Sequence, residues 1–230
     1  MSRFLFATQP ITGHFSPALP IVRTLVERGH EVMWYTGKKF RSKVEAVGAT
    51  FAPYQDAYDY DDSDYDAAFA GRRALKGLNQ IKFDFIQLFM KQIGPQHRDL
   101  QAILLHFSAD VLVGDPSIFA VFTVNEKGGP PNATYNITVL GIKGRDVAPF
   151  GLGMLPIDSA LGRLRNRLLY GLASNVIFKA VSDEFGRQCQ SVGAAPRKFD
   201  GVPVSPYLFL QPTVPACEYP RTDLPPQVHF

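Results

Sequence analysis

Two residues, His14 and Asp115, stand where ligands bind in open parallel sheets. His14 lies a few positions after the first predicted strand (residues 3–8), and Asp115 directly follows the fourth (residues 111–114). In the usual strand order 3-2-1-4-5, strands one and four are neighbours, and ligands bind beyond their carboxyl ends. A histidine oriented by a carboxylate is a general base, because the carboxylate fixes the imidazole tautomer and stabilises the imidazolium. The sequence therefore predicts a His14–Asp115 pair at one crevice.

Other histidines and the nearby Asp110 lie in places that do not suit this chemistry. His30 precedes the second strand, so we expect it at the amino-terminal edge of the sheet, and His97 and His106 lie in or beside predicted helices. Asp110 enters the fourth strand, about 16 Å from the residue that leaves it at 3.3 Å per residue. We interpret the three histidines as structural or surface residues and Asp110 as a turn residue.

The absence of several common motifs narrows the reaction. No serine lies in a G-x-S-x-G elbow, so a hydrolase triad is unsupported. The loop after the first strand lacks G-x-G-x-x-G, which disfavours a nicotinamide or flavin dinucleotide site, and the sequence has no P-loop. Cys189 and Cys217 form no C-x-x-C, so we expect neither a metal site nor a disulfide framework. With no protein nucleophile evident, the base is expected to deprotonate a substrate hydroxyl.

The elements that must position this pair alternate between strand and helix. Strand patterns cover residues 3–8, 31–36 and 49–53, and helical patterns cover residues 16–28 and 38–47. Ser16-Pro17 begins the first helix, because serine caps free backbone N–H groups and proline is tolerated in the first turn. Alternation at this pace predicts βαβ units on a parallel sheet. The predicted fold class is therefore α/β, with a Rossmann-like doubly wound parallel sheet.

The middle of the chain departs from this rhythm. Residues 54–66 hold six Asp and four Tyr without a hydrophobic period, which predicts a solvated loop. Residues 74–93 predict a long helix that Gly94-Pro95 interrupts, because proline removes a hydrogen bond and clashes with the preceding turn. Further predicted elements are strands at residues 111–114 and 132–139, a loop at 141–156, and a helical stretch at 159–192 that is broken near Gly171.

The last 30 residues are rich in proline. Residues 201–230 contain seven of the 18 prolines of the chain. Prolines this dense cannot form a helix and are poor in central strands. We expect this segment to be extended, lying over the surface or leading elsewhere, with residues 227–230 patterned like the beginning of a strand.

Composition is typical of an ordinary globular protein. The 230 residues suit one large domain or two small ones, and 46% hydrophobic with 20% charged residues excludes disorder. The net charge of +3 is too small to suggest nucleic-acid binding. No apolar run approaches the roughly 20 residues that span a bilayer, and the N-terminal apolar run is too short for a signal peptide. We therefore expect a cytoplasmic protein.

The residues around His14 resemble the opening of family 1 glycosyltransferases, most closely the bacterial macrolide-type branch that acts on natural products. The similarity is carried by Thr12-Gly13-His14-Phe15-Ser16-Pro17, Pro20 and residues 25–32 (LVERGHEV), and by Gln211-Pro212-Thr213-Val214-Pro215 with Leu224-Pro225-Pro226. The resemblance implies one half of a GT-B fold, in which two Rossmann-like domains face each other across a cleft. The N-terminal domain would bind the acceptor, and the C-terminal domain would bind the nucleotide sugar.

This resemblance also implies roles for the paired residues and a division of the chain. His14 would be the catalytic base and Asp115 its partner, in an inverting transfer from a UDP- or TDP-sugar to a hydroxyl of an apolar aglycone, without metal or cofactor. Residues 1–200 would form the acceptor-binding domain, and residues 201–230 would lead to a C-terminal donor domain. The donor motifs have no counterpart in this sequence, so the 230-residue chain alone is expected to be inactive.

An apolar acceptor needs a mostly apolar pocket with a few polar groups. The candidates for lining it are Phe85, Phe89, Met90, Asn136 and Phe150, each with an alternative interpretation as a core or exposed-loop residue. Three arginines, Arg163, Arg165 and Arg167, are interpreted as a solvated helix edge, with weak contact to a membrane surface or to the donor domain as alternatives.

Two other classes of function stay open at this point. One is a small-molecule binding module without catalysis, which differs from the transferase in lacking a second Rossmann-like domain. The other is a Rossmann-type oxidoreductase, which is weakened by the missing glycine fingerprint and would reveal itself by binding NAD or NADP.

Overall fold

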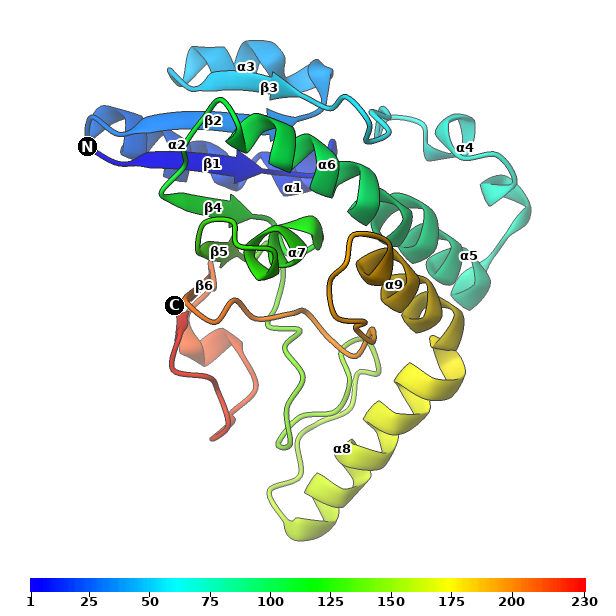
Figure 1. The fold of residues 1–230 in the computed structure, drawn as a ribbon. Coiled ribbons are helices and arrows are strands. Elements are labelled where there is room, and N and C mark those ends of the chain that lie inside the picture. Colours follow the sequence, from blue (N-terminus) through cyan, green and yellow to red (C-terminus); the bar gives the residue numbers. More distant parts are fainter.

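The chain folds around one seven-stranded parallel sheet with the order β3-β2-β1-β4-β5-β6-β7 (Figure 1). The computed structural model describes residues 1–230. Every neighbouring pair of strands runs parallel. The strands are β1 (Arg3–Ala7), β2 (Glu31–Thr36), β3 (Thr50–Pro53), β4 (Val111–Gly114), β5 (Asn132–Tyr135), β6 (Leu208–Leu210) and β7 (Val228–His229). The predicted order 3-2-1-4-5 is therefore confirmed, and two further strands extend it.

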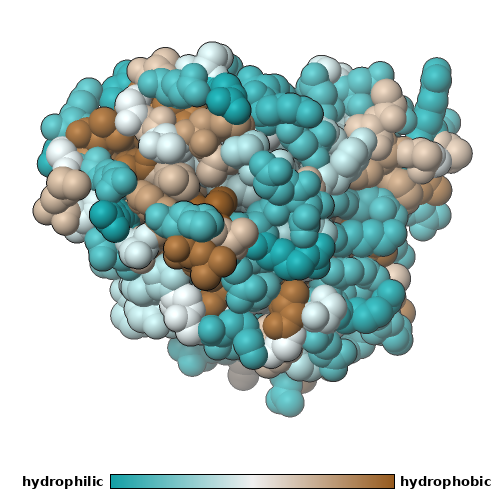
Figure 2. Space-filling model, turned by 45° about the horizontal axis from the view of Figure 1, so that its top comes forward, coloured by the Kyte–Doolittle hydropathy of each residue, from teal (hydrophilic) through white to brown (hydrophobic).

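Helices cover both faces of the sheet. They are α1 (Thr12–Phe15), α2 (Ala18–Glu27), α3 (Arg41–Ala46), α4 (Tyr65–Ala68), α5 (Gly77–Asp84), α6 (Ile93–Leu104), α7 (Ala120–Glu126), α8 (Ala160–Leu172) and α9 (Lys179–Ser191). Successive β1 side chains alternate between two cores, as the period of a strand requires. Leu5 packs in the core that includes α6 and α7, and Phe6 packs in the core that includes α2 and α3. Most of the face in Figure 2 is hydrophilic, with hydrophobic residues gathered in separate patches.

The long helix predicted for residues 74–93 is interrupted earlier than expected. After α5 the chain makes a π-helical turn at Phe85–Phe89 and a 3₁₀ turn at Met90–Gln92 before α6 begins. Gly94 and Pro95 lie in the first turn of α6, where the missing proline N–H has no intrahelical partner to lose. The prediction that Gly94-Pro95 breaks the helix was therefore wrong, and the distortion falls on the phenylalanines instead.

The loop at residues 54–66 packs onto the molecule rather than projecting into solvent. Tyr54 and Tyr60 are buried, and the Tyr54 hydroxyl donates to the backbone oxygen of Thr8 at the end of β1. Asp59 accepts a hydrogen bond from the backbone N–H of Lys38. The prediction of a solvated loop holds for most of the acidic side chains, including the exposed Asp61 and Asp64. It was wrong for Tyr54 and Tyr60, because tyrosine rings can be buried without any helical or strand period.

Residues 201–230 run largely extended, as predicted, but they also contribute to the sheet. Residues 208–210 form β6 beside β5, and residues 228–229 form β7 beside β6. The expectation that this segment only lies over the surface or leads elsewhere was therefore too narrow, and the strand pattern at residues 227–230 is confirmed. The predicted domain boundary at residue 200 lies inside the unit that forms the sheet. That residues 201–230 lead to a C-terminal donor domain stays a prediction.

The helical stretch predicted at residues 159–192 is present, with its break at the expected place. Ser159 caps α8 by accepting from the N–H of Gly162, and a π-helical turn after Leu172 separates α8 from α9. Arg163 pairs with Asp146 at 3.1 Å. Nothing in the structure supports the alternative that this edge contacts a membrane surface. No helix of the chain combines the length and apolarity needed to cross a membrane.

The two cysteines differ in burial, which gives a simple test of this packing. Cys189 lies in the α9 core, and burial raises the pKa of its thiol to about 11, whereas Cys217 is exposed. Because the thiolate is the reactive form, we expect maleimide at pH 7.5 to label one thiol per native chain. Peptide mass mapping should place the label on Cys217, and rapid labelling of Cys189 would contradict the described core.

Candidate functional site

The structure brings His14 and Asp115 together at the carboxyl edge of the sheet. His14 lies in α1, which follows β1, and Asp115 follows β4, the neighbouring strand. The His14 Nδ1 atom is 3.0 Å from Asp115 Oδ1. The Asp115 side chain is fully buried, whereas the His14 side chain keeps 16% of its surface exposed. The predicted proximity of the two residues is confirmed, and it leaves the imidazole open to a ligand while its partner is shielded.

Asp115 is held by several hydrogen bonds from the surrounding backbone. The backbone N–H of Gln9 donates to one carboxylate oxygen at 2.7 Å, and the backbone N–H of Ser117 donates to the other at 2.8 Å. Burial works to raise the pKa of the carboxyl, but the His14 charge and these hydrogen bonds outweigh it and hold the pKa below its ordinary value. Asp115 is therefore a carboxylate at neutral pH and can fix the tautomer of His14.

Ser117 is a third member of the site that the sequence analysis missed. Its hydroxyl donates to Asp115 Oδ1 at 2.6 Å and lies 3.1 Å from His14 Nδ1. The available signal was its position two residues after Asp115, since a serine there can bond back across a turn. With Nδ1–H shared between the carboxylate and this hydroxyl, Nε2 is the ring nitrogen left to accept a proton.

Ser117 should contribute measurably to the stability of the chain. Its nearly buried hydroxyl bonds a buried carboxylate, so Ser117→Ala is expected to lower the free energy of unfolding by about 1–3 kcal/mol. Urea unfolding followed by circular dichroism measures this change. The control is Ser16→Ala at an exposed serine; the helix-capping role predicted for Ser16 was wrong, because α2 begins after Pro17 without a side-chain cap. A Ser117 variant as stable as that control would mean that the hydroxyl does not support the carboxylate.

The local sequence explains why the His14 imidazole faces outward. Its neighbour Phe15 is fully buried, with its ring stacked on Trp34 at 4.4 Å and on Phe40 at 4.1 Å. The backbone oxygen of His14 accepts from the Tyr135 hydroxyl at 2.8 Å. These contacts hold α1 on both sides, so the helix cannot rotate to turn the imidazole inward. The direction of the His14 side chain is therefore set by the packing of Phe15 and by the bond from Tyr135.

The imidazole lines a cavity of about 310 Å³. Phe85 and Phe89 from the π-helical turn form part of its wall, and the Phe89 ring centroid lies 6.1 Å from that of His14. Arg72 and Asp84 close one side through two parallel hydrogen bonds of 2.7 and 3.0 Å. Because these charges pair with each other, the cavity suits a neutral apolar ligand. The other lining residues are Ile11, Tyr65, Ile81 and Leu88.

Three of the five acceptor-pocket candidates lie elsewhere. Met90 is fully buried in the α9 core, because the 3₁₀ turn rotates it away from the cavity. Asn136 is buried, and its amide nitrogen donates to the Gln211 side chain and to backbone oxygens after β5, so it organises a loop. Phe150 is 65% exposed and lines a different cavity. Phe85 and Phe89 are the two candidates that the fold places beside His14.

The residues set aside in the sequence analysis lie where they were expected. His30 accepts a hydrogen bond from the N–H of Ser2 at the amino-terminal edge, and Asp110 accepts one from the N–H of Arg3. His97 is buried against the Thr123 hydroxyl at 2.8 Å, and burial lowers the pKa of its imidazole. None of them contacts the cavity beside His14.

Two backbone N–H groups of the loop after β1 are already hydrogen-bonded within the chain. In Rossmann-like folds, free N–H groups at the first strand-to-helix loop bind phosphate. Here the N–H of Gln9 is taken by Asp115 and the N–H of Thr12 is taken by Asp62. No group of three or more histidine, cysteine or acidic side chains is arranged to hold a metal ion.

Comparison with known proteins adds independent information. No family model matches the chain. The 4'-demethylrebeccamycin synthase of Lentzea aerocolonigenes is 40% identical over all of this chain and 55% of its own length. UDP-glycosyltransferase 2 of Phaeomoniella chlamydospora is 30% identical over 98% of this chain and 52% of its own length. The chain thus spans about half the length of these curated relatives.

Solved structures agree on the fold. The calicheamicin glycosyltransferase CalG4 matches all of this chain and 52% of its own chain, with a TM-score of 0.60 and 16% sequence identity. At this identity the likeness supports the fold alone, and that fold is one domain of a GT-B enzyme. Over nearly its whole length, the chain is therefore similar to about half of each of these glycosyltransferases.

Proposed function

We propose that this chain is the acceptor-binding half of an inverting glycosyltransferase. The reaction moves a sugar from a UDP- or TDP-sugar to a hydroxyl of an apolar small molecule. The observation that carries the proposal is the His14–Asp115 contact of 3.0 Å at a cavity lined by aromatic side chains. The acceptor lies in this cavity, and the nucleotide sugar comes from a C-terminal donor domain.

The chemistry follows from the two ring nitrogens of His14. Nδ1–H donates to the Asp115 carboxylate, so Nε2 carries the lone pair that accepts the proton of the acceptor hydroxyl. The acceptor oxygen then forms a bond to the anomeric carbon as the bond from that carbon to the diphosphate oxygen breaks. Attack from the face opposite the leaving diphosphate inverts the configuration. Asp115 stabilises the imidazolium until the proton leaves to solvent, and the step needs no metal or cofactor.

Names of the relatives support this reaction class. One is called 4'-demethylrebeccamycin synthase and another UDP-glycosyltransferase 2. These names favour a transferase over the Rossmann-type oxidoreductase kept open from the sequence, as does the occupation of the Gln9 and Thr12 N–H groups by carboxylates. The cytoplasmic location expected from the sequence stays a prediction.

The test joins this chain to the C-terminal half of the 40% identical relative. The resulting two-domain protein is incubated with a panel of hydroxylated aromatic compounds and either UDP-glucose or TDP-glucose, and mass spectrometry detects glycosides. Proton coupling at the anomeric carbon should show a β-linked product from the α-linked donor. A well-folded two-domain protein that binds donor but glycosylates no acceptor, or one that gives an α-linked product, would contradict the proposal.

A further inference from the structure

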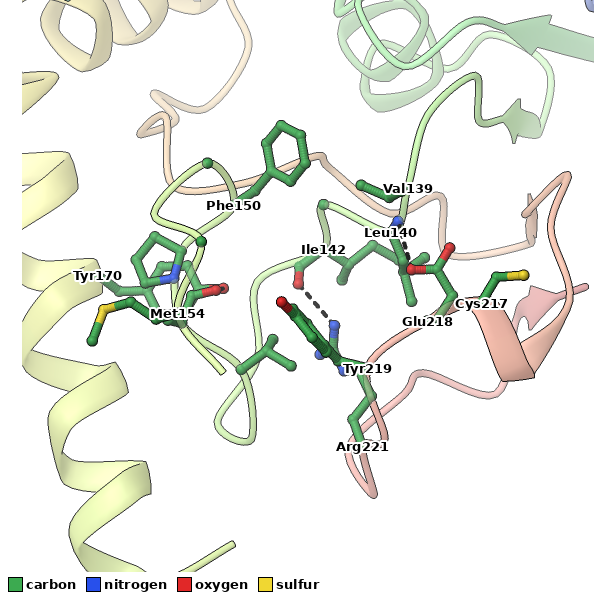
Figure 3. Close-up of a pocket in the computed structure, with 16 residues that line it drawn as sticks. Val139, Leu140, Ile142, Phe150, Met154, Tyr170, Cys217, Glu218, Tyr219 and Arg221 are labelled. Carbon is green, nitrogen blue, oxygen red and sulfur yellow. Dashed lines mark hydrogen bonds between the residues drawn. The ribbon is translucent and has the colours of Figure 1, made fainter. Parts of the chain in front are cut away.

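We propose that a second cavity, beyond β5 and β6, is a binding site for a neutral, flat ring compound that carries a hydroxyl group. This cavity of about 510 Å³ falls in the range of small-molecule sites. It is lined by residues 139–142, 147–151 and 153–154 after β5, by Tyr170 of α8, and by residues 217–219 and 221 after β6 (Figure 3). It shares no lining residue with the cavity beside His14, and the proposal does not rest on the function proposed above.

The floor of this cavity is fixed by hydrogen bonds between its two walls. Arg221 donates to the backbone oxygen of Ile142 at 2.9 Å, and Glu218 accepts from the N–H of Leu140 at 3.1 Å. Just beyond the lining, Asp223 accepts from the N–H of Arg145. These contacts tie segments that are nearly 80 residues apart in the sequence. The cavity is therefore preformed, which lowers the entropy lost when a ligand binds.

Its rim presents aromatic side chains to solvent. Phe150 is 65% exposed and Tyr219 is 47% exposed, although both lie against the cavity. Gly151 and Gly153 have φ values of 89° and 62°, a region that favours glycine, so the chain can turn sharply beside Phe150. Exposed aromatic groups gathered around a concave surface are typical of binding sites rather than of ordinary surface.

The polar groups of the lining define the chemistry of the ligand. The charge of Arg221 is paired with Asp223, and Glu218 accepts from the Gln211 and Thr213 side chains. By contrast, the Tyr219 hydroxyl makes no hydrogen bond within the chain, and Figure 3 shows its side chain extending toward the middle of the lining residues. A ligand therefore meets mostly apolar walls, the Glu218 carboxylate, which is already hydrogen-bonded and disfavours anions, and one free phenol. This lining matches an uncharged ring system with one hydroxyl.

The experiment uses 2-naphthol as the probe and naphthalene as its matched control without a hydroxyl. Fluorescence titration of the 230-residue chain is expected to show binding of 2-naphthol. Tyr219→Phe should weaken that binding about threefold to tenfold, the effect of one lost hydrogen bond, and should leave naphthalene unaffected. Phe150→Ala should weaken binding of both compounds. Tyr207→Phe, an exposed tyrosine outside the cavity, should change neither.

A second readout locates the probe. The chain has four methionines, of which Met154 lines this cavity and Met33 lies in β2. With ¹³C-labelled methionine methyl groups, 2-naphthol should shift the Met154 resonance and leave Met33 unchanged. It should also slow maleimide labelling of Cys217, which lines the same cavity. The proposal is overturned if 2-naphthol fails to bind at its solubility limit, or if Phe89→Ala weakens its binding while Phe150→Ala does not.

Discussion

His14→Ala is expected to lower the turnover of sugar transfer by about 10²- to 10⁴-fold, the usual contribution of a general base. The measurement is made on the two-domain protein described above, at saturating donor and acceptor. The fold should survive, because His14 keeps part of its side chain exposed and belongs to no core cluster. Alanine removes the Nε2 lone pair that accepts the proton, so the loss should appear in kcat rather than in KM for the donor.

The two aspartates that flank β4, Asp110 before it and Asp115 after it, provide the matched control. Asp115→Asn removes the negative charge that stabilises the His14 imidazolium, and it should also impair transfer. Asp110 lies at the amino-terminal edge of the sheet, where its carboxylate only accepts a hydrogen bond from the N–H of Arg3. Asp110→Asn should therefore leave kcat unchanged. Near-normal transfer by His14→Ala, or equal losses from the two aspartate variants, would refute the assignment of the base.

Much of the fold could be predicted from the sequence because parallel sheets impose strong patterns. Strand and helix alternate over residues 3–53, and the usual order of such sheets then places β1 beside β4. Strands β6 and β7 were harder to assign, since they have only three and two residues among prolines. Such short strands carry no readable period, and the pairing of β6 with β5 and of β7 with β6 is decided by tertiary contacts.

The π-helical turn shows a different limit of sequence patterns. Residues 74–93 carry a helical period, yet the turn at Phe85–Phe89 breaks it, and the glycine and proline that signal a break lie inside α6. The break follows from packing: the Phe85 ring lies tilted against that of Phe199, with centroids 4.5 Å apart, while Phe89 lies beside His14. A regular α-helix would aim these two rings differently, and no local sequence signal records that requirement.

The candidate site was predictable as far as backbone topology fixes it. His14 and Asp115 follow neighbouring strands, so their contact follows from strand order alone. Ser117 was missed because serine is common in turns, and only the direction of its hydroxyl makes it part of the site. Met90 and Asn136 were misplaced for the same reason, because the direction of a side chain depends on turn geometry that the sequence does not reveal.

The 230-residue chain alone is expected to transfer no sugar, although His14 and Asp115 are both in place. A base can deprotonate the acceptor, but it cannot bind and orient the donor. Orientation of the reactants lowers the barrier by on the order of 7–11 kcal/mol in well-oriented cases. In this chain the N–H groups of Gln9 and Thr12, two of the backbone donors after β1, are occupied by carboxylates. Overnight incubation with UDP-glucose and 2-naphthol should therefore give no glycoside detectable by mass spectrometry.

Calorimetric titration of the 230-residue chain with UDP-glucose and TDP-glucose tests most directly whether acceptor and donor are bound by separate domains. The two-domain protein serves as the positive control for donor binding. The account predicts no measurable heat of binding for the chain alone at millimolar nucleotide sugar, because the proposed donor site lies in another domain and Asp62 and Asp115 occupy two of the backbone donors after β1. Micromolar binding of either nucleotide sugar to the chain alone would place a donor site here and contradict the assignment of this chain to the acceptor.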